Sequence, residues 1–128
     1  LGYGASFVAQ GTPADMQGLA AVIEEGIRFP GFAFVNVQSP CVTYGQEEQS
    51  LKAQKGMMQT LASLGHDSAD RLKAMALASE YGHKLYTGVF YRNPEPPPTY
   101  EAEARRRQEE TRAQARPKER ILEMFRPQ

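Results

Sequence analysis

The single cysteine of the sequence is the residue best placed to do chemistry. Cys41 follows a short apolar run, Phe32 to Val37, which is bounded by a Pro-Gly pair and by Ser39-Pro40. Such a run is typical of a strand covered on both faces, as in a parallel sheet flanked by helices. Pro40 cannot donate to a sheet ladder, so we expect the strand to end there and to place Cys41 in the loop at its carboxyl end. By itself, a lone cysteine is more often a small buried hydrophobe than a ligand.

The two histidines are the second candidates for chemistry, but positions at helix ends explain both of them more simply. His66 and Asp67 are adjacent and suggest a catalytic dyad. Asp is also a preferred helix cap, which favours Asp67 as a cap with His66 as its exposed neighbour. His83 follows an expected helix end, where its charge complements the helix dipole. Two histidines this far apart do not form a metal site.

The charge balance excludes several classes of partner. Lys and Arg number 15 and Asp and Glu number 15, which argues against general binding to nucleic acid. The run Arg105 to Arg107 lies between glutamates and predicts a solvated helix with internal salt bridges rather than a nucleic-acid contact. No apolar run approaches the roughly 20 residues that cross a bilayer, so we expect no membrane contact. A single cysteine fits a reducing compartment, and we predict a cytoplasmic protein.

The elements that position Cys41 form a strand–helix–strand unit. We expect a strand from Tyr3 to Ala9, a turn at Gln10-Gly11 and a helix capped by Thr12. Four residues at helical spacing are expected to form the buried face of this helix: Leu19, Val22, Ile23 and Ile27. With the strand before Cys41, this order predicts parallel strands joined by a right-handed crossover. The fold class is therefore α/β.

The sequence after Cys41 is predicted to be helical first and then extended. A helix is expected from Glu47 to Leu64 and ends at Gly65. Asp67 or Ser68 is expected to cap a second helix, which carries Leu72, Met75 and Ala76 and closes at Gly82. Leu85 to Tyr91 is apolar and extended, either a strand or a strap across a surface. Met57, Met58 and Met75 are expected to fill the core.

The last part of the chain differs in composition. A proline-rich spacer, Asn93 to Pro98, ends ordered packing, and Tyr100 to Arg116 predicts a solvated or frayed helix. Ile121, Leu122, Met124 and Phe125 are apolar enough to dock on a partner. The expected regions are residues 1–45, part of an α/β domain, residues 46–100, a helical extension, and residues 101–128, a charged tail.

Two separated blocks of the sequence resemble a known family. The first runs GYGASFVAQG at Gly2 to Gly11, then GFAFVNVQSPCVTYG at Gly31 to Gly45. The second is GHDSADRLKAM at Gly65 to Met75, followed by TGVFYRN at Thr87 to Asn93. Together they resemble the β subunit of 2-oxoacid:ferredoxin oxidoreductases, over about Gly2 to Tyr100. The charged tail from Glu101 is expected to fall outside the likeness.

The resemblance implies a partial sheet of a thiamine diphosphate-binding fold and a missing set of cofactor motifs. In the family, a Gly-Asp-Gly motif holds thiamine diphosphate and magnesium, and several cysteines hold a four-iron, four-sulfur cluster. The sequence carries neither that motif nor a cysteine pair. The chain therefore resembles the C-terminal portion of the subunit, cut after the magnesium-binding segment, and we expect no cofactor on it alone. Cys41 occupies the family's Ser-Pro-Cys turn, which implies that it is one ligand of the cluster.

The function that follows is a part of an enzyme. The resemblance implies oxidative decarboxylation of a 2-oxoacid to acyl-coenzyme A with reduction of ferredoxin, and inactivity of this chain alone. The 2-oxoacid is 2-oxoglutarate or pyruvate, and the Gly2 to Gly11 block favours 2-oxoglutarate. Its incomplete sheet is expected to be covered by the rest of the β subunit, by the α subunit or by a second copy, so the isolated chain is expected to self-associate. The alternative is a non-catalytic interaction module that uses the βαβ scaffold and the charged tail.

Overall fold

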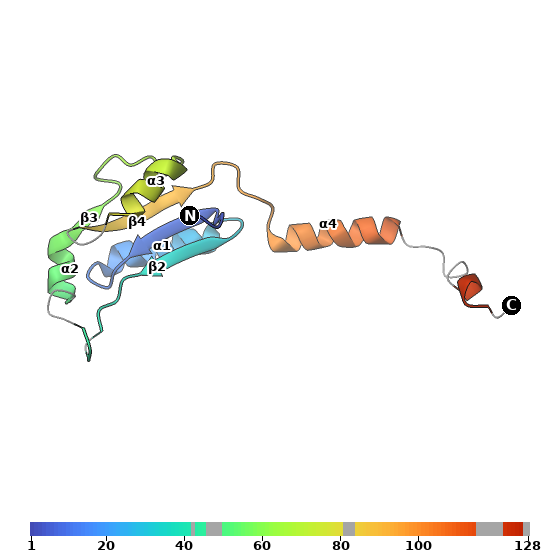
Figure 1. Cartoon of the computed structure of the whole chain (residues 1–128), viewed down its shortest axis with the longest axis horizontal. Helices are drawn as coiled ribbons and strands as arrows, with labels where there is room; N and C mark the ends of the chain where they lie inside the picture. Colours follow the sequence, from blue (N-terminus) through green and yellow to red (C-terminus); the bar gives the residue numbers. More distant parts are fainter. Residues whose placement is uncertain (42, 46–49, 81–83, 115–121, 127–128) are drawn as a thin grey trace. The chain divides into compact units, whose positions relative to one another are not determined.

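The computed structural model describes residues 1–41, 43–45, 50–80, 84–114 and 122–126. It divides into two compact units, Leu1–Pro97 and Pro98–Gln128. The elements follow one another in the order shown in Figure 1: β1 (Phe7–Gly11), α1 (Met16–Arg28), β2 (Ala33–Val37), α2 (Leu51–Met57), β3 (Met58–Thr60), α3 (Arg71–Ala78), β4 (Leu85–Arg92) and α4 (Tyr100–Ala113). None of the described helices is both long and apolar enough to cross a membrane.

The first unit is built on a 4-stranded sheet in the order β2-β1-β4-β3. β1 and β2 are parallel, with Phe7 opposite Ala33 and Gly11 opposite Val37. The expected βαβ unit and the α/β class are therefore confirmed. β1 begins and ends later than expected, because Gln10 and Gly11 continue the strand instead of forming a turn.

Helix α1 covers one face of β1 and β2 (Figure 1). Its buried residues are Leu19, Val22 and Gly26, which pack with Phe7 and Ala9 of β1. Ile23 and Ile27, expected on this face, are exposed, Ile27 by 80%. The apolar residues of this helix cover more than one side of it. The side that carries Leu19 and Val22 faces the sheet, and the side that carries Ile27 faces solvent.

The cap of α1 also differs from the expectation. Asp15, and not Thr12, is the N-cap, because its carboxylate accepts a hydrogen bond from the Gly18 amide at 3.0 Å. Thr12 is instead buried in the core, where its hydroxyl pairs with the side chain of Gln54 on α2. Thr12 therefore joins the βαβ unit to the region that follows it.

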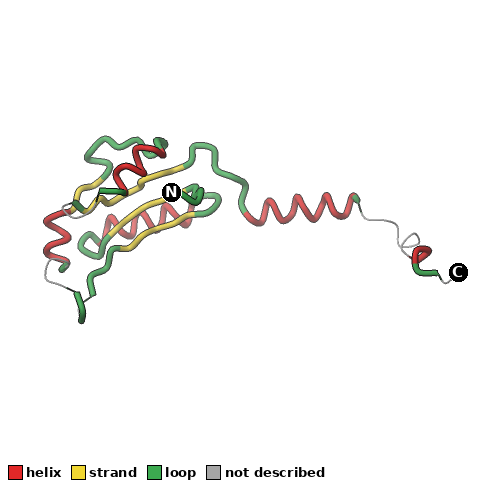
Figure 2. Tube along the Cα trace, viewed as in Figure 1, coloured by secondary structure: helices red, strands yellow, loops and turns green. Residues whose placement is uncertain are grey.

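The long helix expected from Glu47 to Leu64 is confirmed from Leu51 to Met57 and is wrong from Met58 onward. α2 ends at Met57 and continues directly into β3, as the change of colour in Figure 2 shows. β3 pairs in parallel with β4, which is the reason that Met58 to Thr60 leave the helix. Residues 46–49 lie outside the described residues.

Leu85 to Tyr91, predicted to be either a strand or a strap across a surface, lies in strand β4, inside the sheet between β1 and β3. β4 runs antiparallel to β1 and parallel to β3. Tyr86 and Phe90 of β4 form a second core cluster with Leu61 and with Ala74 of α3, on the face opposite α1. The region after Cys41 thus contributes two strands, β4 and β3, to the same sheet as β1 and β2.

Helix α3 is capped by Asp70, whose carboxylate accepts from the Lys73 amide at 2.9 Å. The expected cap at Asp67 or Ser68 is therefore wrong, because the helix begins two or three residues later. The helix ends at Ala78, and the expected end at Gly82 lies outside the described residues, as does His83. Met75 is exposed rather than part of the core, whereas Met57 and Met58 are half-buried.

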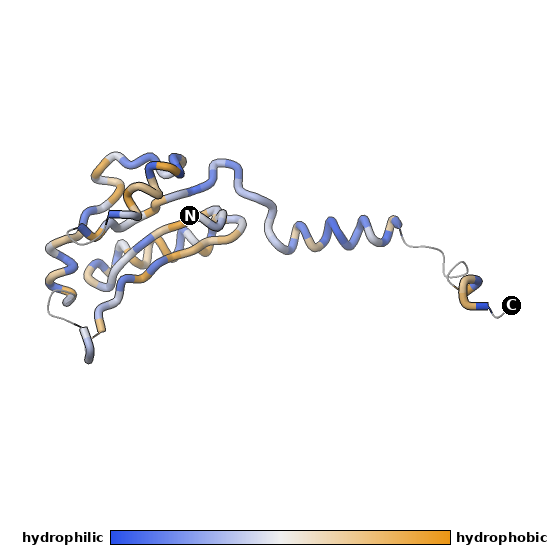
Figure 3. Tube along the Cα trace, viewed as in Figure 1, coloured by the Kyte–Doolittle hydropathy of each residue, from blue (hydrophilic) through white to orange (hydrophobic). Residues whose placement is uncertain are grey.

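Helix α4 belongs to the second unit and confirms the expectation of a solvated helix. It contains no buried residue, and most of its length has the hydrophilic colour in Figure 3. Thr99 caps it by accepting from the Ala102 amide at 3.2 Å. Leu122 and Phe125 beyond it are exposed, and Ile121 lies outside the described residues.

Candidate functional site

Cys41 lies in the loop after the carboxyl end of β2, as the Ser39-Pro40 signal predicts. The thiol is exposed to solvent. The Tyr44 amide donates a hydrogen bond to Cys41 Sγ at 3.3 Å, and the Gly45 amide donates to the Cys41 carbonyl at 2.8 Å. The loop therefore turns back on itself around an outward-facing sulfur atom.

The backbone of this loop favours the thiolate form of Cys41. Hydrogen bonds from the Tyr44 and Thr43 amides lower the pKa of the Cys41 thiol below its usual value. A thiolate, not a thiol, binds metals and attacks electrophiles. Gly45 makes the turn feasible, since a Cβ at this position would lie 2.2 Å from the Cys41 carbonyl oxygen. The loop thus exposes the sulfur atom and donates a backbone amide to it, so Cys41 is not the buried hydrophobe that a lone cysteine usually is.

A network of side-chain amides lies on β1 and β2, near the strand ends from which the Cys41 loop emerges. Gln10 Oε1 accepts from Asn36 Nδ2 at 2.7 Å and from Gln38 Nε2 at 3.4 Å. Gln10 Nε2 donates to the Tyr86 carbonyl at 2.8 Å. The sequence pattern misses this network because it places Gln10 in a turn. The sequence does contain a sign of the network: Asn36 and Gln38 alternate with valines, so both amides are expected on the same face of the strand.

His66 and Asp67 do not form a catalytic dyad. His66 Nε2 hydrogen-bonds the Phe90 carbonyl at 2.7 Å, and Asp67 accepts from the Ala69 amide at 2.9 Å. The imidazole thus ties the turn before α3 to strand β4, while the carboxylate closes a local turn. Both side chains have structural roles within the first unit.

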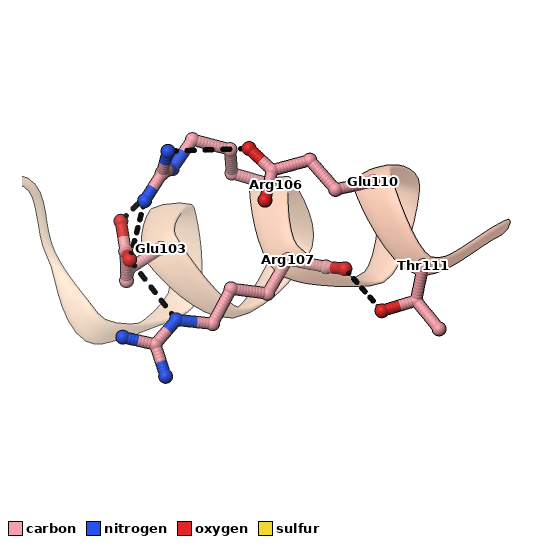
Figure 4. A network of polar contacts seen from close by, with 5 residues as sticks. All are labelled: Glu103, Arg106, Arg107, Glu110 and Thr111. Atoms are coloured by element: carbon pink, nitrogen blue, oxygen red, sulfur yellow. Dashed lines mark hydrogen bonds and ion pairs between the residues drawn. The ribbon is translucent and has the colours of Figure 1, made fainter. Parts of the chain in front are cut away.

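The arginine run on α4 forms salt bridges within its own helix. Glu103 pairs with Arg106 at 2.7 Å and with Arg107 at 3.0 Å, and Arg106 also reaches Glu110 at 3.2 Å (Figure 4). Arg106 and Arg107 hold the pKa of Glu103 below its usual value. The interpretation of this run as a solvated, internally paired helix is confirmed for these residues.

The described residues contain no group of three or more His, Cys, Asp or Glu side chains that could hold a metal ion. Within this part of the chain, Cys41 therefore belongs to no such group. Its loop offers one thiolate, and an iron–sulfur cluster takes a set of about four cysteine ligands.

Solved structures and curated proteins resemble this chain in fold and sequence. The 2-oxoglutarate:ferredoxin oxidoreductase from Magnetococcus marinus, solved with 2-oxoglutarate, coenzyme A and succinyl-CoA bound, superposes with a TM-score of 0.78 at 26% identity. The likeness covers 98% of this chain and 42% of that one. This likeness in fold and sequence gives the class of the chain: a portion of an oxidoreductase subunit.

Sequence comparison identifies the family to which the chain belongs. A family model for the C-terminal region of the pyruvate ferredoxin oxidoreductase beta subunit matches residues 41–109, more than half of the 128 residues. The chain belongs to this family. The KorB subunit of 2-oxoglutarate synthase is 32% identical over 94 residues in Methanothermobacter thermautotrophicus and 33% identical over 94 residues in Methanothermobacter marburgensis.

These matches confirm the expected family and correct the extent of the resemblance. The family model continues to residue 109, so most of α4 belongs to the matched region and not to a tail outside it. The 94 aligned residues are 73% of this chain but 32% of each KorB sequence. The chain therefore spans about a third of the length of its curated relatives.

Proposed function

We propose that this chain forms the C-terminal part of the β subunit of a 2-oxoacid:ferredoxin oxidoreductase. The reaction converts a 2-oxoacid, coenzyme A and two oxidised ferredoxins into acyl-coenzyme A, carbon dioxide, a proton and two reduced ferredoxins. The observation that carries the proposal is the structural likeness over 98% of the chain to an enzyme solved with 2-oxoglutarate and coenzyme A. The names of both curated relatives favour 2-oxoglutarate over pyruvate as the substrate.

Within that enzyme, Cys41 would bind one iron of a four-iron, four-sulfur cluster. The bound cluster supplies one-electron transfer towards ferredoxin. The loop fits this role because the sulfur atom is exposed, its pKa is lowered, and backbone amides already donate to it. Hydrogen bonds to the sulfur ligands are among the factors that set cluster potentials. The remaining ligands would come from outside this chain, because Cys41 is its only cysteine.

The residues of this chain do not fit thiamine diphosphate and magnesium. The sequence has no Gly-Asp-Gly segment. We therefore assign these cofactors to the rest of the β subunit and expect no activity from this chain alone. Its partners would be that remaining part, the α subunit and ferredoxin, in the cytoplasm.

The substitution Cys41→Ser tests the proposed role. The chain is purified anaerobically with its native partner polypeptides, and iron content, electron paramagnetic resonance of the reduced cluster and 2-oxoglutarate-dependent reduction of ferredoxin are measured. We expect loss of cluster signal and a fall in ferredoxin reduction of roughly a hundredfold or more, since changing only a residue that orients a metal ligand already costs about 10–100-fold.

Tyr44→Phe serves as the matched control, because it keeps the loop backbone and the donating amide while changing an equally exposed side chain. It is expected to retain the cluster and the activity. A Cys41→Ser enzyme with full iron content and an unchanged spectrum would contradict the assignment of Cys41 as a ligand.

A further inference from the structure

Two consecutive residues, the last of β1 and the one after it, hold both ends of the segment that carries Cys41. The Gly11 carbonyl accepts a hydrogen bond from the Gln38 amide at 2.9 Å, where the segment leaves β2. The Thr12 hydroxyl donates to the side chain of Gln54 on α2, where the segment returns to the fold. The segment is therefore fastened at both ends to one short stretch of backbone.

The strand that leads into this segment gives it little support. Each residue of β2 is half-buried or exposed, and the side chain of Phe34 is 51% exposed. The expectation that β2 is covered on both faces is therefore wrong for the described part of the chain. Because few buried contacts mean low local stability, the hydrogen bonds at the two ends matter more for the position of the segment.

Helix α2 is attached to the core through a polar side chain. Its buried residue is Gln54, 8% exposed, and its contact is with Thr12, 1% exposed. A buried polar group is unfavourable unless its hydrogen bonds are made, so the two side chains need one another. Apolar packing tolerates a small shift of a helix, whereas a buried hydrogen bond is made in one register. The pair therefore suits the precise placement of α2 better than its general stabilisation.

The Thr12 hydroxyl is well oriented for this contact. It accepts a hydrogen bond from the Ala14 amide at 3.2 Å, and its single proton is donated to Gln54. The neighbouring Gly11 lies close to α1, since a Cβ at this residue would be 3.2 Å from the Leu19 Cα atom. The segment is thus anchored to a tightly packed part of the β1-α1 connection.

The bonds within the Cys41 loop shape it but do not place it against the sheet. The Tyr44 amide donates to Cys41 Sγ and the Gly45 amide donates to the Cys41 carbonyl, both inside the loop. A cluster that takes its other ligands from outside this chain requires the thiolate at a defined position. That position is set by the anchors at Gly11 and Thr12.

We propose that Thr12 and Gln54 are positioning residues for the cluster ligand Cys41. They act through the backbone of the segment and not by binding iron. Their hydrogen bond fixes the point at which the segment returns to the fold, so that the thiolate meets the ligands supplied from outside this chain. The inference rests on the proposed function and adds two residues on which retention of the cluster and its reduction potential depend.

The test compares Thr12→Val, which keeps the shape of the side chain but lacks the hydroxyl, with Thr12→Ser, which keeps the hydroxyl. Amide exchange of Tyr44 and Gly45 is measured by NMR on the full chain alone. Iron loss to a chelator and the reduction potential of the cluster are measured on the enzyme purified anaerobically with its native partner polypeptides.

For Thr12→Val we expect both amides to exchange, and iron to be lost, about tenfold faster. The potential is expected to become more negative, because a loosened loop weakens the Tyr44 hydrogen bond that stabilises the extra negative charge of the reduced cluster. Thr12→Ser is expected to behave like the unsubstituted protein. Thr87→Val makes the same change at another buried threonine, on β4, leaves the Thr12–Gln54 pair intact and is expected to alter none of the three readouts.

A double variant separates positioning from stability. Thr12→Val with Gln54→Leu replaces both polar partners by apolar groups, so the midpoint of urea unfolding is expected to recover. Amide exchange and iron loss are expected to stay fast, because the bond that fixes the register is still missing. Recovery of all these properties together would show that the pair only stabilises the core and would overturn the proposal.

The outcomes also separate this inference from the assignment of Cys41. Unchanged exchange, iron loss and potential in Thr12→Val would refute the positioning role and leave Cys41 as a ligand. A full cluster in Cys41→Ser would contradict the proposed function and, with it, a role of Thr12 in positioning a ligand, whereas faster Tyr44 exchange in Thr12→Val would still show that Thr12 holds the loop.

Discussion

Gly45 controls the chemistry of the only thiol in the chain. A Cβ at residue 45 would meet the Cys41 carbonyl oxygen at 2.2 Å, so Gly45→Ala has to open the turn and weaken the amide contacts to sulfur. Because those contacts lower the pKa of Cys41, their loss raises it towards the usual value. At neutral pH the variant then holds less thiolate. We expect its rate of alkylation by iodoacetamide to reach half-maximum at a higher pH than in the unsubstituted chain.

Gly56→Ala is the matched control for this measurement. Nothing lies within 4 Å of a Cβ built at Gly56, in helix α2. The change is expected to leave the alkylation profile unmoved and to stabilise the helix by roughly 0.5–1 kcal/mol. An equal profile in both variants would show that the turn does not tune the thiol.

Gln10 is the shared partner of the amide network. Gln10→Leu removes the acceptor for Asn36 and Gln38 and the donor to the Tyr86 carbonyl. Leaving half-buried polar groups without partners costs about 1–3 kcal/mol, and we expect urea unfolding to report a loss of that size. Gln38→Leu removes only the long, exposed contact at 3.4 Å and is expected to change stability by less than about 0.5 kcal/mol. Equal losses in the two variants would contradict the central role of Gln10.

Single residues also show what a sequence can reveal. The position of Cys41 follows from local rules, because proline both ends the strand and directs the chain into a loop. The helix caps do not follow from local rules. Asp15, Asp67 and Asp70 have the same side-chain chemistry, and only the backbone conformation decides which of them accepts a hydrogen bond from a helix amide. The lowered pKa of Cys41 depends on amide directions that no residue type encodes.

At the scale of elements, Arg92 fastens β4 to α1. Its guanidinium pairs with Glu25 and lies 5.7 Å from the ring centroid of Phe7 and 6.0 Å from that of Phe29. Both charged groups are more than a third exposed, so solvent screens the pair. We expect Arg92→Gln to cost about 1 kcal/mol, and a double-mutant cycle with Glu25→Gln to give a coupling of roughly 0.2–1 kcal/mol that shrinks with salt. Strictly additive single changes would mean that the pair contributes nothing.

The helix α4 is expected to respond to pH through Glu103. Its pKa is lowered by Arg106 and Arg107, so the carboxylate stays ionised below the usual range for glutamate. The stabilisation it gives is present above the pKa of the unfolded chain and is lost as the pH falls through the lower folded value. Circular dichroism is expected to show that the unsubstituted chain loses helical signal as the pH falls, and that Glu103→Gln loses less over the same pH range. Glu109→Gln, outside the network in Figure 4, is expected to titrate like the unsubstituted chain.

Elements are predictable where their contacts are local. The β1-α1-β2 unit follows from apolar spacing and turn residues, and α4 follows from charge pairs three and four residues apart. The helix expected through Met58 is wrong because Met58 to Thr60 pair with β4, which follows more than twenty residues later. Pairing over that distance overrides helical spacing, and a single sequence does not display it.

For the whole molecule, the division after Pro97 predicts that the two units unfold independently. Helix α4 buries none of its residues, so removing everything after Pro97 takes no buried side chain from the sheet unit. We expect the shortened chain to keep the midpoint of urea unfolding and the cooperative transition of the full chain, while losing only helical signal. A lower midpoint would mean that the second unit supports the first.

The same truncation separates the two candidate functions. If the chain is part of an oxidoreductase β subunit and meets the rest of that subunit through its sheet, removal of α4 leaves the complex with the amino-terminal part of KorB intact. If it is an interaction module that binds through α4 and Leu122 to Phe125, the truncated chain folds but no longer binds. Sedimentation of the full and shortened chains with that probe distinguishes these outcomes. Because both chains keep the exposed edge of β2, each is also expected to self-associate as its concentration rises when the probe is absent.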